Sequence, residues 1–178
     1  EVVALDLPGH GDRSHEEVGV EAGAPALAAT GGAGTWLGYS LGAGVAFRFA
    51  AQHPQKVRRL VLVSGAYAQD GFYPEMLPQQ AQVGAGMAEA MKDTPMYKTY
   101  AAVAPNPQDF PKLLDEMGAW MRKPYDWSAD VKKLSMPVML VYGDSDMFRP
   151  EHIVKFYQLL GGGLKDAGWQ REHMSQNR

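Results

Sequence analysis

The sequence Gly38-Tyr39-Ser40-Leu41-Gly42 decides the fold of this 178-residue chain, because a strand is predicted directly before it and a helix directly after it. Thr35-Trp36-Leu37 leads into it as a short strand. After it, apolar residues at positions 41, 45, 46, 49 and 50 follow the spacing of a helix with one core-facing side, and Pro54 ends that helix after His53. The pattern predicts a tight strand-to-helix turn at Ser40.

A Gly-x-Ser-x-Gly sequence in this context is typical of a nucleophilic serine held on a strained turn. Gly38 and Gly42 leave room for the strand and the helix to pack closely. The backbone N–H of Leu41 lies at the helix N-terminus, where it can donate to a developing oxyanion. The alternative is a glycine-rich turn that binds phosphate and carries the serine by chance. We interpret Ser40 as a nucleophile.

A serine nucleophile needs a base, and the base needs an orienting carboxylate. The loop Gly143-Asp144-Ser145-Asp146 follows a predicted strand, and we predict Asp146 as this acid. Asp144 directly follows the glycine that ends the strand, so we expect it to cap the turn. After the strand predicted over 57–64, the nearest acid is Asp70, which is a weaker candidate because it lies further along the chain.

No histidine is a convincing base. After Asp146 the chain contains only His152 and His173. We expect His152 on the surface or in a capping role, in the first turn of the helix that begins at Pro150. His173 lies in a polar segment with no preceding strand to position it, and His10 is expected to fix the geometry of an early turn.

Three further apolar runs predict buried strands, at residues 1–7, 57–64 and 137–142, and a helix is predicted from Pro150 to Leu160. The run over 57–64 is almost continuously apolar, as expected in a parallel sheet that is covered on both faces. Strand, helix, strand, insertion, strand and helix in this order predict an α/β fold with a mostly parallel sheet.

The remaining segments are less regular. Glycines and Pro25 within residues 15–34 predict a poor or broken helix of low local stability. Methionines, aromatic residues and prolines within residues 67–128 predict an inserted helical cap, with helices at 79–92 and 109–122. The predicted organisation is therefore a first part of the core at 1–66, the cap at 67–128 and a second part of the core at 129–178.

The apolar residues of the predicted cap suit an acyl pocket, since flexible methionines adapt to different ligands. Many of the chain's ten methionines lie in this segment. The alternative is that these side chains only pack the cap helices together. The predicted pocket residues are Tyr39, Met87, Met91, Tyr97, Tyr100, Trp120 and Met121.

Composition excludes several classes of function. A net charge of -3 gives no reason to expect nucleic acid as a partner, and no apolar run approaches the ~20 residues of a membrane span. The chain has no cysteine, which excludes disulfides and thiolate catalysis and fits the reducing cytoplasm. With no metal-ligand cluster and no dinucleotide fingerprint, we expect no metal and no cofactor.

Glu1 opens directly into an apolar run and 173–178 is polar, so we interpret both ends as cut.

The nine residues from Asp6 to Ser14, Asp-Leu-Pro-Gly-His-Gly-Asp-Arg-Ser, resemble the Asp-x-Pro-Gly-x-Gly-x-Ser turn of the α/β-hydrolase superfamily. Three further features of the family follow in the family's order. They are the serine turn at 38–42, His53-Pro54 before the strand at 57, and the 143–146 loop with Pro150. The chain is most similar to bacterial esterase-like serine hydrolases with a helical lid. The resemblance implies Ser40 as nucleophile, Asp146 as triad acid and the Leu41 amide as one oxyanion donor.

The resemblance also implies what this chain departs from. The family's catalytic histidine follows a further strand, and its second oxyanion donor lies in an earlier His-Gly loop; we expect this truncated chain to lack both. We therefore expect a serine hydrolase that cleaves a carboxylic ester of an apolar small molecule through an acyl-enzyme on Ser40, with the isolated chain inactive or very slow. The alternative is a non-catalytic binding protein of the same fold. Epoxide and haloalkane chemistry is least expected, because it uses aspartate at the position of Ser40.

Overall fold

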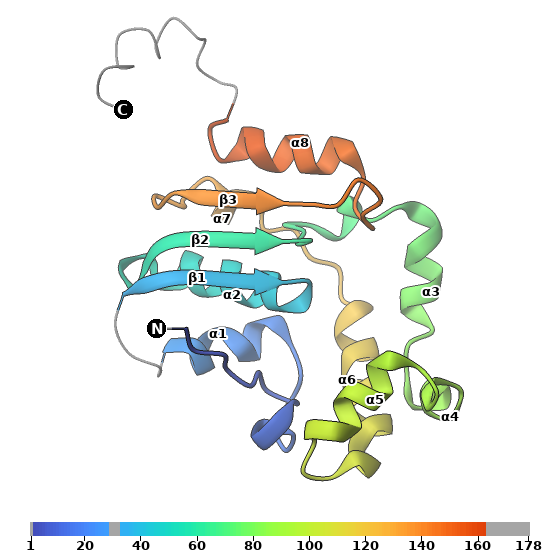
Figure 1. Ribbon diagram of the computed structural model, residues 1–178. Helices are drawn as coiled ribbons and strands as arrows, with labels where there is room; N and C mark the ends of the chain where they lie inside the picture. Colours follow the sequence, from blue (N-terminus) through green and yellow to red (C-terminus); the bar gives the residue numbers. More distant parts are fainter. Residues whose placement is uncertain (1, 29–32, 163–178) are drawn as a thin grey trace, which may run out of the picture.

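The computed structural model of the chain describes residues 2–28 and 33–162 (Figure 1). Within them, β1 (Gly34–Tyr39), β2 (Val57–Val63) and β3 (Val138–Val141) form a parallel sheet in the order β1-β2-β3. The three strands fall where the apolar runs predict them. The α/β class with a parallel sheet and flanking helices is confirmed.

Helices connect the strands and fill the long segment between β2 and β3 (Figure 1). Those that follow Ser40 and Arg149 begin where the sequence predicts. The α-helices are α1 (Val20–Ala28), α2 (Leu41–Gln52), α3 (Leu77–Ala81), α4 (Ala88–Met91), α5 (Pro95–Val103), α6 (Phe110–Met121), α7 (Ser128–Val131) and α8 (Pro150–Leu159). The 3-10 turns are η1 (Gly11–Arg13), η2 (Pro54–Lys56), η3 (Gln69–Gly71), η4 (Pro74–Met76), η5 (Ala85–Met87) and η6 (Pro107–Asp109).

The main core lies on one face of the sheet. Leu60 and Leu62 of β2 are buried in one cluster with side chains from α1, α2, α7 and α8, among them Phe49 and Phe156. Burying a side chain of this size stabilises a fold by about 1.5–3 kcal/mol relative to leaving it in water. This cluster fixes α2, and with it the turn at Ser40, against the sheet.

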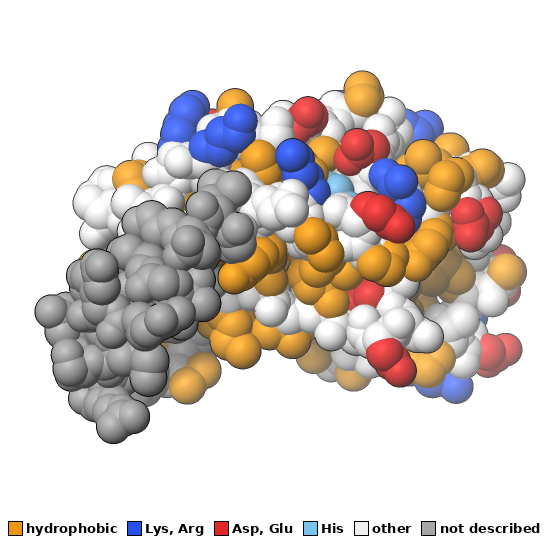
Figure 2. Space-filling view, turned by 90° about the horizontal axis from the view of Figure 1, so that it is seen from above, with side chains coloured by type: hydrophobic (Ala, Val, Ile, Leu, Met, Phe, Trp, Pro, Cys, Tyr) orange, Lys and Arg blue, Asp and Glu red, His pale blue; other side chains and the backbone are white. Residues whose placement is uncertain are grey.

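The opposite face of the sheet is open in the part of the chain that the structure describes. Leu37, Val61 and Met139 lie in one row across it by the strand register. Leu37 is 67% exposed and Met139 is 60% exposed. The expectation of a sheet covered on both faces is therefore wrong for residues 2–28 and 33–162, because the helices of the main cluster pack on the face of Leu60. Hydrophobic side chains are also exposed on the side viewed from above (Figure 2).

Helix α1 is continuous over nine residues, so the expected break is wrong there, although Pro25 lies inside the helix, where it cannot donate a backbone hydrogen bond. Val20 and Ala24 are fully buried against the core. Gly23 packs so close to α2 that a Cβ at this position would lie 2.6 Å from Cγ1 of Val45. The glycine that weakens the helix locally is thus what allows it to approach α2, and tertiary packing overrides the local propensity.

Residues 2–7 form no strand, contrary to the prediction from their apolar run. Val2 is 97% exposed. A strand needs a ladder partner for its backbone N–H and C=O groups, and among the described residues β1 pairs only with β2. The turn that follows is ordered, because Asp6 Oδ2 accepts the amide hydrogen of Asp12 at 3.1 Å.

In the segment between β2 and β3, helices α3 to α6 lie beyond the carboxyl ends of the strands (Figure 1). The predicted helix at 109–122 is confirmed as α6. The single helix predicted over 79–92 is wrong: α3 ends at Ala81 and α4 begins at Ala88, because the extended backbone of Gly84 interrupts the helical path. A second apolar cluster, which includes Tyr100 and Phe110, forms the interior of this segment.

Candidate active site

Ser40 stands at the end of β1 in a left-handed backbone conformation, with φ 52° and ψ -118°. Its amide donates to the Val63 carbonyl at 3.0 Å, which ties the turn to β2. The Ser40 side chain is exposed and does not cap α2. Gly38 permits the tight crossing, since a Cβ there would overlap the carbonyl oxygen of Gly42. The turn has the predicted geometry at Gly38 and Ser40, but the close packing expected at Gly42 is wrong, because a Cβ there would approach nothing beyond its own helix within 4 Å.

Leu41 begins α2 directly after the turn. The amides of the first helical turn have no acceptor within their own helix, so the Leu41 N–H is available to a bound oxyanion. The Leu41 side chain is partly buried against both apolar clusters, the main core and the interior of the insertion. The turn at Ser40 therefore lies at the junction between the sheet and the insertion.

Asp146 is held by three hydrogen bonds. Its Oδ2 accepts from the Ser64 hydroxyl at 2.7 Å and from the Gly143 amide at 3.2 Å, and its Oδ1 accepts from the Met147 amide at 2.7 Å. Among the described residues, Asp146 and not Asp144 satisfies the amides of this turn, which corrects the expected capping role of Asp144. The carboxylate of the predicted acid is thus fixed at the carboxyl end of β3.

Ser64 is the residue that the sequence reasoning missed. It directly follows β2, and its amide donates to the Val141 carbonyl at 2.9 Å. Next to it, the hydroxyl of the partly buried Tyr142 donates to the Gly65 carbonyl at 2.6 Å. Burial, and then the charge of Asp146, raise the pKa of Tyr142 well above its usual value, so this hydroxyl remains a donor. A polar residue directly after the apolar run 60–63 was the available signal.

His152 is buried, so the expected surface or capping role is wrong. It is 4% exposed, and its ring stacks on Tyr67 with 4.1 Å between ring centroids. The backbone of Gly71 covers the other side of the ring, where a Cβ would lie 2.6 Å from Cδ2. His152 Nδ1 lies 3.6 Å from Asp70 Oδ1. His152 lies four residues after Phe148, in the loop before α8, and four residues before Phe156, on α8. This helical spacing with two aromatic residues was a signal that its side chain faces the core.

The other histidines lie apart from Ser40 and Asp146. His10 Nδ1 is 3.1 Å from the Pro8 carbonyl, which fits its expected role in the early turn. The His53 ring lies 5.3 Å from that of Phe49. His173 lies outside the described residues. Within residues 2–28 and 33–162, therefore, no histidine hydrogen-bonds to Ser40 or to Asp146.

The predicted pocket residues are distributed over different environments. Met91 and Tyr97 are partly buried around Tyr100 in the second cluster. Tyr39 is 67% exposed on the open face of the sheet. Trp120 packs against the main core and stacks on Tyr125. Met87 is exposed, and Met121 is partly buried. The acyl pocket remains a prediction.

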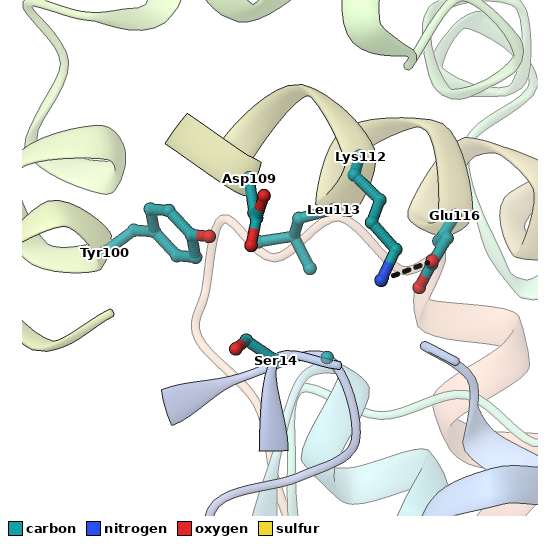
Figure 3. Close-up of a pocket in the computed structure, with 7 residues that line it drawn as sticks. Ser14, Tyr100, Asp109, Lys112, Leu113 and Glu116 are labelled. Atoms are coloured by element: carbon teal, nitrogen blue, oxygen red, sulfur yellow. Dashed lines mark ion pairs between the residues drawn. The ribbon is translucent and has the colours of Figure 1, made fainter. Parts of the chain in front are cut away.

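A small hollow separates the early turn from α5 and α6. Ser14 faces it from the turn, and Tyr100, Asp109 and Leu113 face it from the opposite side (Figure 3). Lys112 Nζ lies 3.5 Å from Glu116 Oε1 at its edge. Of the predicted pocket residues, Tyr100 is the one that lines this hollow.

The described residues offer neither a metal site nor a membrane span. Within residues 2–28 and 33–162, no three His, Asp or Glu side chains are grouped as metal ligands. No helix in this part of the chain has both the length and the hydropathy to cross a bilayer.

Comparison with known proteins gives consistent matches. A sequence model described as the alpha/beta hydrolase family matches residues 1–174. A pimeloyl-(acyl-carrier protein) methyl ester esterase of Neisseria meningitidis serogroup A is 31% identical over 175 residues, covering 87% of this chain and 56% of that protein. NosK from Streptomyces actuosus has a TM-score of 0.65 at 24% identity, covering 90% of this chain and 71% of NosK. A thermophilic esterase from Thermogutta terrifontis has a TM-score of 0.60 at 20% identity, and the match covers 87% of this chain and 66% of the esterase.

Proposed function

Because this chain belongs to the α/β-hydrolase family, we propose that the protein is a serine hydrolase that cleaves a carboxylic ester through an acyl-enzyme on Ser40. The observation that carries this proposal is the Ser40 turn. A left-handed serine follows a strand, its hydroxyl is exposed, and the next amide opens a helix. These are the features by which such a turn presents a nucleophile.

In the proposed reaction, Ser40 Oγ attacks the ester carbonyl carbon while a base takes the hydroxyl proton. The carbonyl oxygen becomes an oxyanion that accepts from the Leu41 amide. The C–O bond to the alcohol then breaks, the alcohol leaves with the proton, and the acyl group remains on Ser40. Water, deprotonated by the same base, hydrolyses this acyl-enzyme. Asp146 orients the base and stabilises its charged form.

The substrate that we propose is an apolar small-molecule ester. Its acyl group would lie beyond the carboxyl ends of the strands, where parallel sheets bind their ligands and where the apolar insertion lies in this chain (Figure 1). The esterase relative is named for a methyl ester, which supports an ester substrate. The lack of cysteine supports a reducing compartment, so we propose the cytoplasm.

The chain itself is expected to react slowly. Ser40 and Asp146 have no histidine partner among the described residues, and the loss of a triad member lowers turnover by several orders of magnitude. We expect a fluorophosphonate to label Ser40 slowly, and added imidazole to accelerate the labelling because it can act as the base. Intact-mass spectrometry of the 178-residue chain follows the reaction.

The control is Ser40→Ala, which should give no labelling with or without imidazole. Labelling of Ser40→Ala at the original rate would contradict the assignment of Ser40 as the nucleophile. Rapid Ser40-dependent hydrolysis of a short-chain aryl ester without imidazole would contradict the slow reaction, and would point to His173 as the base.

A non-catalytic binding protein of the same fold is the second candidate, because no histidine among the described residues contacts Ser40. It would bind an apolar ester without cleaving it. Saturable binding of a non-hydrolysable ester analogue, together with no Ser40 labelling in imidazole, would support this candidate instead.

A further inference from the structure

Two serines in the described part of the chain have positive φ, and no other residue there does except glycine. They are Ser40, with φ 52°, and Ser64, with φ 48°. A side chain in this region of backbone conformation is strained, and such strain persists where the surrounding structure imposes it. The strain at Ser40 belongs to the nucleophile turn. The strain at Ser64 has no such explanation, and glycine would occupy the position at lower cost.

The Ser64 hydroxyl points at the predicted acid. Ser64 Oγ lies 2.7 Å from Asp146 Oδ2, 82 residues further along the chain. A hydrogen bond to a carboxylate is stronger than one between neutral groups. The two other donors to Asp146, the amides of Gly143 and Met147, belong to its own loop. Ser64 is therefore the donor that fixes this carboxylate relative to the sheet.

The segment around Ser64 also contacts the nucleophile turn. Val63 accepts the Ser40 amide, and Ser64 donates its own amide to Val141 of β3. The next residue, Gly65, packs on α2 so closely that a Cβ there would lie 2.7 Å from the Ala43 Cβ. The end of β2 thus joins the turn that carries Ser40 to the loop that carries Asp146.

We propose that Ser64 is a positioning residue, whose hydroxyl holds the Asp146 carboxylate in a fixed position relative to Ser40. This inference rests on the proposed function, in which Asp146 orients the base. The left-handed backbone of Ser64 is what directs its hydroxyl toward the acid loop. The Oδ1 atom, with one amide donor, keeps acceptor capacity for the N–H of the base.

The test uses Ser64→Gly and Ser64→Ala as a matched pair in the full chain. Both variants remove the hydroxyl, but only alanine keeps the strained Cβ. We expect the side-chain ¹³C carboxyl resonance of Asp146, assigned by its loss in Asp146→Asn, to move in both variants. We also expect imidazole-accelerated labelling of Ser40 to fall roughly tenfold in both, because a charged hydrogen bond is lost. In urea unfolding, Ser64→Gly should have the higher midpoint of the two.

Two outcomes would overturn the inference: an Asp146 resonance that is unmoved in both variants, or a labelling loss in Ser64→Ala that Ser64→Gly does not share. The second would show that the backbone, and not the hydroxyl, matters. If imidazole fails to accelerate labelling even in the unaltered chain, the proposed function fails, and the Asp146 resonance still decides whether Ser64 positions this carboxylate.

Discussion

Gly38→Ala is expected to destabilise the chain by about 3 kcal/mol or more, because the added methyl group meets backbone that cannot move aside. A Cβ at Gly38 would overlap the Gly42 carbonyl oxygen and lie 2.7 Å from the Ala43 Cα. Both atoms belong to α2, which the main core holds against the sheet. Relief would require α2 to move away from β1 and would open the turn at Ser40. Urea unfolding followed by circular dichroism measures the loss.

Gly42→Ala is the matched control, since it adds the same methyl group to the other glycine of the pattern. Apart from its chain neighbours and the backbone of its own helix, no atom lies within 4 Å of a Cβ at Gly42. Alanine is also a better helix former than glycine, by about 1 kcal/mol at most. We expect Gly42→Ala to be as stable as the original chain or more stable. Equal midpoints for Gly38→Ala and the original chain would contradict the close crossing of β1 and α2.

Lowering the pH from 7 to 4 is expected to destabilise the chain through His152. Burial lowers the pKa of His152 to about 4, despite the opposing charges of Asp70 and Asp126, and Arg149 lowers it further. In the unfolded chain a histidine pKa is about 6.5. Between these values the unfolded state binds the proton and the folded state does not, so stability is complete above about pH 6.5 and is lost as the pH falls toward 4.

The full effect of this one group amounts to about 3 kcal/mol at most. Urea unfolding at several pH values measures it, with His152→Phe as the control. Phenylalanine keeps an aromatic ring against Tyr67 and beneath Gly71, but it does not titrate. We expect the stability of His152→Phe to depend less on pH between 4 and 6.5, since the carboxyl groups then contribute alone. An identical pH dependence in both proteins would rule out His152 as the cause.

The sequence predicted well those features that arise from neighbouring residues. The apolar spacing after Ser40 gave α2, and the apolar runs gave β2 and β3. Each depends on contacts within one or two turns of helix or along one strand. The same reasoning failed over residues 2–7, whose apolar pattern is correct for a strand, because no strand among the described residues pairs with them. It failed again at α1, which contacts with α2 stabilise against the local effect of Gly23.

By itself, the sequence determined the family and the Ser40 turn, because Gly38 and Ser40 act on residues close to them in the chain and need only a strand before them and a helix after them. Only the tertiary structure decided the surroundings of Asp146 and His152. Ser64 meets Asp146 because β2 and β3 pair in parallel and in register, so their carboxyl ends lie side by side. His152 is buried because the start of the insertion folds over α8. Such contacts join residues some eighty positions apart, and no local pattern specifies them.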